Sequence, residues 1–530
     1  MRDRGRLWPW VVVGGAMALN AGLALHGLGT RPLSSDEAAS VFYATRPHMA
    51  GIFGDGGNMA LYYLLLRLVV EAFGASVTHD RWLSVASGVA TIPIVYSLGT
   101  YVMRRRGAAL AACIAAVSLP TVFWEQTARG YALEGLLVSV SMLAVLRLER
   151  AATRPTLWLY VLSTTLAVYT SLVAIVIAPL QLAASAVGTR WAAGSESDGR
   201  DGPGRRRLLA AEARAVATIG ALVVPVVAVA VHHGGAQIAW IPRPGLESGW
   251  STAVTLASGA SANGAPTAIG YVAPFAVAFL VVAAAGLARL FRTSVPTAAT
   301  PGATSMPAAA TPGATSGPVK RAAVLFALWT VGPAGVAFAA SQIGSTHYYL
   351  DRYFTLSLPA VALLIAAALD GISRRWLLAL AGAIVVSLRF APIPSAYGVP
   401  LDGATETSYL LSLARPGDCI TFPPEDGTSP GLATDFAYFS RLRRELQRLP
   451  SPIFPGFTWT SALSGSFDIP DPPFRGIVDV ASGCQRIWVT LGPGGEGDYI
   501  EGTRIIYFEF HGWKEGWHRL FRGIGFSVLV

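Results

Sequence analysis

An apolar run leads directly into an acidic pair in the stretch "RLWPWVVVGGAMALNAGLALHGLGTRPLSSDEAAS", residues 6–40. The run, at about residues 7–28, is long enough to cross a bilayer, which takes roughly 20 apolar residues. It follows the basic segment "MRDRGR" and shows no small-residue cleavage site, so we expect a retained helix with a cytoplasmic N-terminus. Asp36 and Glu37 would then emerge outside the membrane. Most carboxylates in such loops are only solvated, so the rest of the chain decides whether this pair has a role.

The composition is that of a membrane protein with many spans. Of the 530 residues, 53% are apolar and 13% are charged, and the mean hydropathy is +0.49. Soluble domains carry about 25% charged residues. The net charge of +9 does not indicate a nucleic-acid partner, because the arginines cluster in short runs between apolar segments, as in cytoplasmic loops. Lysine occurs only at Lys320 and Lys514, a bias typical of a GC-rich bacterial genome.

The apolar runs predict about eleven transmembrane helices. The segment 156–187 is too long for one span, so we expect two helices that turn near residues 169–172. Residues 48–74 are expected to lie along the outer surface, and His79 and Asp80 to be capping and interfacial residues at the start of the second span. Every arginine-rich loop then falls on the same side of the membrane. The expected spans lie at about residues 7–28, 81–103, 108–123, 132–148, two within 156–187, 213–232, 269–291, 322–341, 355–369 and 376–388.

This topology divides the chain into a mainly α, polytopic core at residues 1–390 and an extracytoplasmic domain at 391–530. The C-terminal region has β-like runs, "RIWVTLG" and "RIIYFEF", and we expect a small α/β domain. Residues 293–319 contain "AATPGATS" twice and predict a disordered cytoplasmic linker. Cys113 lies in an apolar run and is expected to be a packing residue. Cys419 and Cys484 fall in the outer domain, where a disulfide is permitted, but sequence separation leaves their pairing open.

Charged and polar groups gather in the loops that this topology places outside. They are Asp36, Glu37 and Asp55 in the first outer loop, Glu125, Gln126 and Arg129 in the second, and His347, Tyr348, Tyr349, Asp351, Arg352 and Tyr353 in the last. Ionisable groups at a membrane boundary are costly to desolvate and are usually partnered. Two interpretations stay open at this point, a structural ion-pair network and a shared functional cavity.

The motifs that are missing narrow the chemistry. No phosphate-binding glycine loop, DxD pair, HExxH or Ser-His-Asp pattern is present, and "GPGGEG" at 492–497 indicates only a turn. Nucleotide donors are scarce outside a cell, so a donor there would be carried by a membrane lipid phosphate. Its enzyme needs a carboxylate to deprotonate an acceptor hydroxyl and arginines to bind the departing phosphate. Asp36 and Arg352 fit these roles; no metal ligand set is predicted, although a divalent cation near Asp36 or Asp55 is left open.

Four stretches resemble the GT-C glycosyltransferases, in the branch of the protein mannosyltransferases and the lipid A aminoarabinose transferases. They are "SSDEAASVFYATRP", the segment "GDGGNMALYYLLLRLVVEAFGASVTHDRWLSVASGVATIPIVYSLG" at 54–99, "FWEQTARGYAL" at 123–133 and "YLDRYFTLSLPAVALLIA" at 349–366. The likeness is good over about residues 30–190, is patchy to about 390, and does not extend to the C-terminal domain. It implies a polyprenyl-phosphate-sugar donor and inverting transfer at the extracytoplasmic face of the cell membrane.

The resemblance also implies roles for individual residues. Asp36 would be the catalytic base and Glu37 would orient it or the acceptor. Arg129 and Arg352 would bind the donor phosphate. The substrate pocket would be lined by Asp55, Glu125, Tyr131 and Tyr353.

Two positions depart from the family pattern. Met59-Ala60 replaces prolines before "LYYLLL", and Thr127 stands where a Glu is usual, two residues before Arg129. The second departure makes the place of Glu125 in the pocket less certain than that of Asp36.

The donor sugar and the acceptor are not readable from these residues. Mannose is the first expectation and arabinofuranose the second, with a glycan, a lipid or a protein as acceptor. Two other classes stay open, a transporter or flippase of a lipid-linked sugar and a scaffold whose outer domain holds other enzymes. A transporter often has internal repeats and charges at mid-membrane depth, whereas no duplicated half is seen here.

Overall fold

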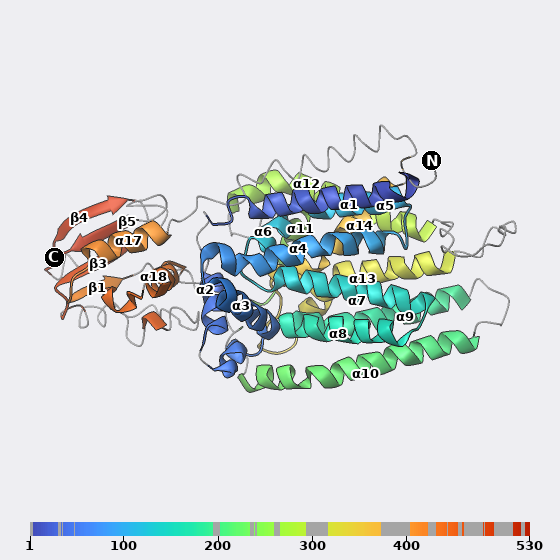
Figure 1. Ribbon diagram of the computed structural model, residues 1–530, viewed down its shortest axis with the longest axis horizontal. Helices are drawn as coiled ribbons and strands as arrows, with labels where there is room; N and C mark the ends of the chain where they lie inside the picture. Colours follow the sequence, from blue (N-terminus) through green and yellow to red (C-terminus); the bar gives the residue numbers. More distant parts are fainter. Residues whose placement is uncertain are drawn as a thin grey trace.

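In the computed structural model the chain forms a bundle of long helices with a small sheet domain at one end (Figure 1). The structure describes all residues except 1–3, 30–32, 34, 47, 194–201, 234–237, 239–240, 259–265, 293–315, 371, 373–402, 422–430, 443, 454–457, 461–480, 482, 492–511 and 521–524. The sections below concern the residues it describes.

Apolar helices form the bundle. Among the described residues, six helical segments are long and apolar enough to cross a membrane, and α5 with α6, bent by 55° at their junction, can form a seventh span. The predicted polytopic helical fold is therefore confirmed. The bundle helices are α1 (Arg4–Leu25), α4 (Val77–Gly99), α5 (Arg105–Ala116), α6 (Leu119–Glu125), α7 (Tyr131–Arg150), α8 (Arg154–Thr170), α9 (Ile177–Ala193), α10 (Gly202–His233), α12 (Pro266–Arg292), α13 (Ser316–Ser341) and α14 (Leu358–Leu369).

Most of the expected spans correspond to one of these helices. The turn predicted near residues 169–172 is confirmed, because α8 ends at Thr170 and the 3-10 helix η2 (Leu172–Val176) follows. Helix α13 begins at Ser316, inside the region expected to be a linker, which was predicted to reach residue 319. The rest of that linker, the expected span at 376–388 and the domain boundary near residue 390 lie outside the described residues.

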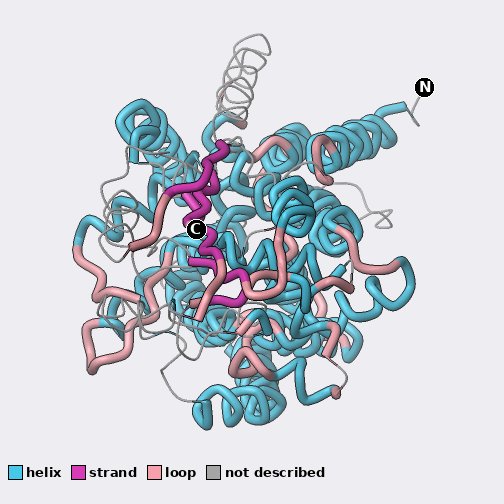
Figure 2. The backbone as a smooth tube through the Cα atoms, turned by 90° about the vertical axis from the view of Figure 1, so that its left-hand side faces the viewer, coloured by secondary structure: helices cyan, strands magenta, loops and turns pink. Residues whose placement is uncertain are grey.

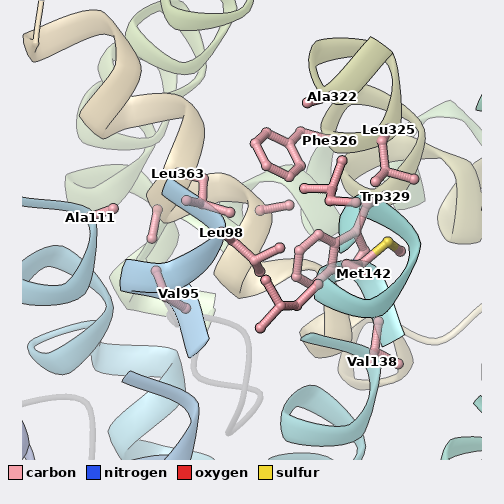
Figure 3. Close-up of a cluster of buried hydrophobic side chains, with 14 of the residues drawn as sticks. Val95, Leu98, Ala111, Val138, Met142, Ala322, Leu325, Phe326, Trp329 and Leu363 are labelled. Atoms are coloured by element: carbon pink, nitrogen blue, oxygen red, sulfur yellow. The ribbon is translucent and has the colours of Figure 1, made fainter. Parts of the chain in front are cut away.

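Buried side chains of α4, α5, α7, α13 and α14 meet in the middle of the bundle (Figure 3). Leu98 of α4, Met142 of α7, Trp329 of α13 and Leu363 of α14 are all buried there. Within a membrane such contacts stabilise by close packing, since lipid tails are as apolar as the side chains. Glycine permits the closest approach: a Cβ at Gly286 of α12 would collide with the backbone of α14.

Short elements cover the end of the bundle nearest the sheet domain. They include α2 (Ser35–Ala44), η1 (Met49–Phe53) and α3 (Ala60–Phe73), which Figure 1 shows between the long helices and the sheet. Two further short elements are α11 (Leu246–Ser258) and the 3-10 helix η4 (Asp351–Ser357), which lie in the loops before α12 and α14. The residues predicted to bear chemistry lie on α2 and η4, in the loop between η1 and α3, and from the end of α6 to the start of α7.

In the described part of the sheet domain, five strands pair in the order β2-β1-β3-β5-β4. Figure 2 shows strands in magenta near the C-terminus. Strand β1 pairs in parallel with β2 and β3, and β5 is antiparallel to β3 and β4, so the expected small α/β domain is confirmed. The run "RIWVTLG" forms β3, whereas "RIIYFEF" lies outside the described residues. The elements are α17 (Gly403–Leu413), β1 (Asp418–Thr421), α18 (Gly431–Leu442), η5 (Leu446–Arg448), β2 (Ser451–Pro452), β3 (Arg486–Leu491), β4 (Glu515–Leu520) and β5 (Gly525–Leu529).

A disulfide joins Cys419 of β1 to Cys484, just before β3. Disulfides persist in oxidising compartments and are rare in the cytosol. Cys113 of α5 is a free, partly buried thiol. The pairing that the sequence left open is therefore settled by the fold of the sheet domain.

Candidate active site

Asp36 forms an ion pair with Arg352 across 316 residues of sequence. Asp36 lies in the first turn of α2, where a helix dipole favours a carboxylate, and Arg352 lies in η4. The Arg352 Nη1 donates to Asp36 Oδ2 at 2.7 Å. The Asp36 side chain keeps 37% of its surface exposed, so an incoming molecule can reach it.

Arg129 brings a second cation to the same place. It is buried in the connection between α6 and α7 and its Nη1 donates to the Asp36 backbone oxygen, to Ser40 Oγ and to the Tyr63 hydroxyl, each at 3.3 Å. Its backbone oxygen accepts from Ser84 Oγ at 3.2 Å. Its Nε has no hydrogen-bond partner in the described part of the chain. A buried guanidinium with a free donor is suited to hold an anion.

Asp55 joins this network through a tyrosine. The Tyr63 hydroxyl, which accepts from Arg129, donates to Asp55 Oδ2 at 2.9 Å. Burial raises the pKa of the Asp55 carboxyl above its ordinary value, although Arg129 and the Tyr63 hydrogen bond act in the opposite direction. Burial also acts to raise the pKa of Asp36, but Arg352 and Arg129 outweigh it and hold that pKa below the ordinary value of an aspartate. The site thus holds one carboxyl group that stays ionised and one that protonates more readily.

Glu37, next to Asp36, points into a different environment. Its carboxylate is 1% exposed and accepts from Arg81 Nε at 2.8 Å and Nη2 at 3.0 Å. The Ala128 backbone N–H also donates to Glu37 Oε1, at 2.7 Å. Arg81 is 0% exposed and donates to the Leu28 oxygen at 2.6 Å. Glu37 therefore ties α2 to α4 and to the loop that carries Arg129.

Asp351 fixes the element that carries Arg352. The Asp351 carboxylate accepts from Ser251 Oγ at 2.6 Å and from Thr252 Oγ1 at 2.5 Å, both on α11. Thr255, one turn further along α11, contributes a longer contact of 3.4 Å. Hydrogen bonds to an ionised group are stronger than those between neutral groups, so the hydrogen bonds from α11 to Asp351 limit the movement of η4. The long outer loop thereby helps to position Arg352.

Glu125 lies apart from this network, in the interior of the bundle. Its two carboxylate oxygens accept from Asn20 Nδ2 of α1 at 3.1 and 3.0 Å. Gly88 of α4 makes room for it, because a Cβ there would stand 2.1 Å from Glu125 Oε1. The structure therefore places Glu125 among α1, α4 and α6, away from the hydrogen bonds of Asp36.

Tyr131 and Tyr353 border the charged groups. Tyr131 begins α7, and its ring packs against Trp124 with centroids 4.4 Å apart. Its hydroxyl is buried without a hydrogen-bond partner among the described residues, and it lies within electrostatic reach of Arg352 and Arg129. Tyr353, next to Arg352 on η4, is partly buried against apolar side chains.

Four of the eight predicted site residues thus form one hydrogen-bonded network, and they are Asp36, Asp55, Arg129 and Arg352. The sequence analysis did not single out Arg81, Tyr63 or Ser40, which position them. Tyr63 falls one residue after another buried tyrosine in "LYYLLL", and nothing in its spacing marks it as a partner of Asp55. Arg81 could have been noticed as a charged residue at the start of an apolar span.

Two further features bear on ligands. Among the described residues, no group of three or more His, Cys, Asp or Glu side chains could hold a metal ion.

An apolar groove of about 700 Å³ lies between α8, η2, α9 and α10, with Val168, Ile175 and Val223 in its walls. Val226 of α10 packs against Gly57, in the loop of Asp55, so the outer half of α10 adjoins the polar site.

Solved structures with the same overall fold include two ArnT structures and an archaeal oligosaccharyltransferase. The crystal structure of apo ArnT from Cupriavidus metallidurans has a TM-score of 0.55 at 14% identity, covering 100% of this chain and 98% of that chain. The ArnT structure bound to undecaprenyl phosphate has a TM-score of 0.53, also at 14% identity, covering 98% of each chain. The apo oligosaccharyltransferase of Archaeoglobus fulgidus has a TM-score of 0.51 at 12% identity, covering 92% of this chain and 70% of that chain.

No family model and no curated protein matches the chain. At the identities of these solved structures the likeness establishes the fold, and the activity has to be argued from the site.

Proposed function

We propose that this protein is a membrane glycosyltransferase that moves a sugar from a polyprenyl-phosphate donor to a hydroxyl acceptor, with inversion at the anomeric carbon. The observation that carries the proposal is the contact between a reachable carboxylate, Asp36, and the guanidinium group of Arg352, with Arg129 beside them. A general base next to two phosphate-binding cations is the minimum that such a displacement needs.

The reaction is a single displacement. Asp36 accepts the proton of the acceptor hydroxyl while the acceptor oxygen bonds to the anomeric carbon. The bond from that carbon to the phosphate oxygen breaks, and its electron pair leaves on the polyprenyl phosphate. Arg352 and Arg129 stabilise the charge on the departing phosphate. Glu37 acts through its pair with Arg81 and holds Asp36 in position.

The contact between Arg352 and Asp36 suits this sequence of events. Arg352 Nη1 donates to Asp36 Oδ2. A phosphate that takes over the Arg352 donors would release the Asp36 carboxylate for the acceptor. Asp36 needs no raised pKa for this role, because correct placement against a readily leaving phosphate supplies much of the rate.

We place the prenyl chain of the donor in the apolar groove between α8 and α10. Its walls are aliphatic, and it adjoins the loop of Asp55 through the contact of Val226 with Gly57. The solved ArnT structure with undecaprenyl phosphate and an AglB structure with a dolichol-phosphate have the same fold, which supports a lipid-linked donor. Mannose is the first candidate sugar and arabinofuranose the second; a glycan, a lipid or a protein is the acceptor.

We further propose a core at residues 1–390 with a cytoplasmic N-terminus and an extracytoplasmic domain at 391–530. The Cys419–Cys484 disulfide supports an outer position for that domain, since outer compartments are oxidising. The cell membrane of a bacterium, with a cell-wall polymer or a secreted protein as target, is the setting that fits best.

Incubation of the purified protein with radiolabelled polyprenyl-phosphate sugars tests the function. Wild type should release sugar from one donor by transfer or slow hydrolysis, and Asp36→Asn should bind that donor but release little. Glu71→Gln is the matched control, because Glu71 lies on nearby α3 with its side chain 56% exposed. Tight donor binding by wild type with sugar movement across a vesicle membrane, and without bond cleavage, would favour a flippase. No donor binding at all would favour a scaffold.

A further inference from the structure

The sheet domain is docked on the helix that carries Asp36. Arg441 of α18 donates from Nη2 to Thr45 Oγ1, just after α2, at 2.9 Å, and its guanidinium lies 5.7 Å from the Phe42 ring centre. Phe436 and Phe439 of α18 belong to the same buried apolar cluster as Phe42. The domain therefore shares a core with α2 and is more than a tethered appendage.

A second contact reaches past α2 to the start of α4. The Tyr438 hydroxyl of α18 donates to Asp80 Oδ2 at 2.6 Å. Asp80 is 0% exposed and Tyr438 is 2% exposed. Ser76 caps α4 by accepting from the His79 backbone N–H, and a hydrogen bond from the Ser76 backbone also reaches the Asp80 side chain, so Asp80 takes part in the cap as expected. Asp80 is in addition a buried carboxylate that receives a hydrogen bond from the sheet domain.

Asp80 is followed in the chain by Arg81, the partner of Glu37. The charged and titratable groups that act on Asp80 are Tyr438, Glu37 and Arg81. Arg81 holds Glu37 through two hydrogen bonds, and Glu37 also accepts from the Ala128 backbone N–H. A buried carboxylate that lost its hydroxyl partner would compete with Glu37 for the Arg81 guanidinium.

We propose that the C-terminal domain is a working part of the active site and that Tyr438 is a positioning residue. Its hydroxyl donates to Asp80 Oδ2, which leaves Arg81 to Glu37, and Glu37 in turn sets the first turn of α2 and thus Asp36. The inference rests on the proposed function for its kinetic test only. It assigns the outer domain a role in catalysis that is separate from any binding of the acceptor.

A double-mutant cycle tests the chain of contacts. Tyr438→Phe should lower kcat about tenfold, with a smaller change in the donor KM, since Arg129 and Arg352 are untouched; tenfold corresponds to roughly 1.4 kcal/mol. Asp80→Asn removes the charge that competes for Arg81, so the double variant should recover most of the kcat lost in Tyr438→Phe. Tyr348→Phe is the matched control, because Tyr348 is 44% exposed in an outer loop. Additive losses in the double variant, or wild-type kcat in Tyr438→Phe, would overturn the proposal.

Hydrogen–deuterium exchange gives a readout that does not depend on the reaction. Exchange of the Ala128 amide and of the α2 amides should accelerate in Tyr438→Phe and return toward wild type in the double variant. If Tyr438→Phe cannot be purified, the test compares Asp80→Asn with the double variant Asp80→Asn/Tyr438→Phe. The kcat values of these two variants should differ less than twofold, and a tenfold lower kcat in the double variant would refute the inference.

The two proposals fail in different ways. Wild type that turns over no donor would remove the proposed function, and the exchange comparison would still decide whether Tyr438 sets α2. Turnover that depends on Asp36, combined with unchanged kcat and exchange in Tyr438→Phe, would remove only the role of the outer domain.

Discussion

Two adjacent carboxylates should respond in opposite ways to the loss of their charge. In Glu37→Gln, Arg81 stays 0% exposed and loses its anionic partner. Breaking a buried ion pair from one side costs about 3–5 kcal/mol, because the remaining charge is desolvated and unpaired. In Asp36→Asn, the lost pair with Arg352 is partly exposed, at 37% and 29%, so the expected cost is about 1 kcal/mol or less.

Thermal unfolding in detergent, followed by the fraction that stays monodisperse, measures the difference. Domains are stable by only about 5–15 kcal/mol, so Glu37→Gln should lower the unfolding temperature strongly while Asp36→Asn shifts it little. Sugar transfer should show the reverse order per folded molecule, with Asp36→Asn the more damaged. The Glu37→Met/Arg81→Met pair is the control, since replacing both charges should restore part of the stability. Equal unfolding temperatures for Glu37→Gln and Asp36→Asn would refute the division of roles.

Three more predictions follow from the site. The acid limb of the kcat/KM profile should lie at a lower pH than the ordinary pKa of an aspartate, since the lowered pKa of Asp36 keeps the base ionised. Arg352→Gln should move that limb upward because it removes the first of the two cations that lower this pKa, and an unmoved limb would exclude Asp36 as the titrating group. Gly220→Leu should raise KM for long-chain donors and not for short-chain ones, because Gly220 lines the apolar groove and has no atoms within 4 Å of a Cβ position; equal effects on both chain lengths would move the prenyl chain elsewhere. Asp351→Asn should lower kcat about tenfold by weakening the charged hydrogen bonds from α11, whereas an unchanged kcat would show that η4 does not depend on Thr252.

Local patterns in the sequence were enough for the helical core. Long apolar runs and arginine-rich loops predicted most spans, because a bilayer imposes length and composition on each helix separately. The break at Ser171 could be predicted because the apolar segment was too long for one span and too short for two spans with a loop. The start of α13 at Ser316 could not be predicted, because the repeated Pro/Ala/Thr tract has no apolar periodicity up to that residue.

The sequence could predict which residue types form the candidate site, but it could not predict which side chains pair with one another. The acidic pair and the two arginines followed from their place at the boundary, but their partners depend on contacts between distant segments. Arg81 reaches Glu37 across 44 residues and Tyr438 reaches Asp80 across 358. No local rule distinguishes Asp36 from Glu37 either, although the helix leaves the Asp36 side chain partly exposed and buries that of Glu37.

Glu125 is a residue whose surroundings could not be predicted from its position in the sequence. Its place in the sequence, near Arg129, suggested the pocket, but α6 is short and its helical turn directs the carboxylate to Asn20. The C-terminal domain was the least predictable part. Its short strands carry little signal by themselves, and its contact with α2 is set by the tertiary fold.

The single-turnover rate of sugar transfer by Asp36→Asn, measured with donor bound, tests the central claim most directly. The account predicts a fall of at least about a hundredfold relative to wild type and to Glu71→Gln, with donor affinity retained, because only the general base is lost. A rate within threefold of wild type would contradict it and would remove Asp36 as the base.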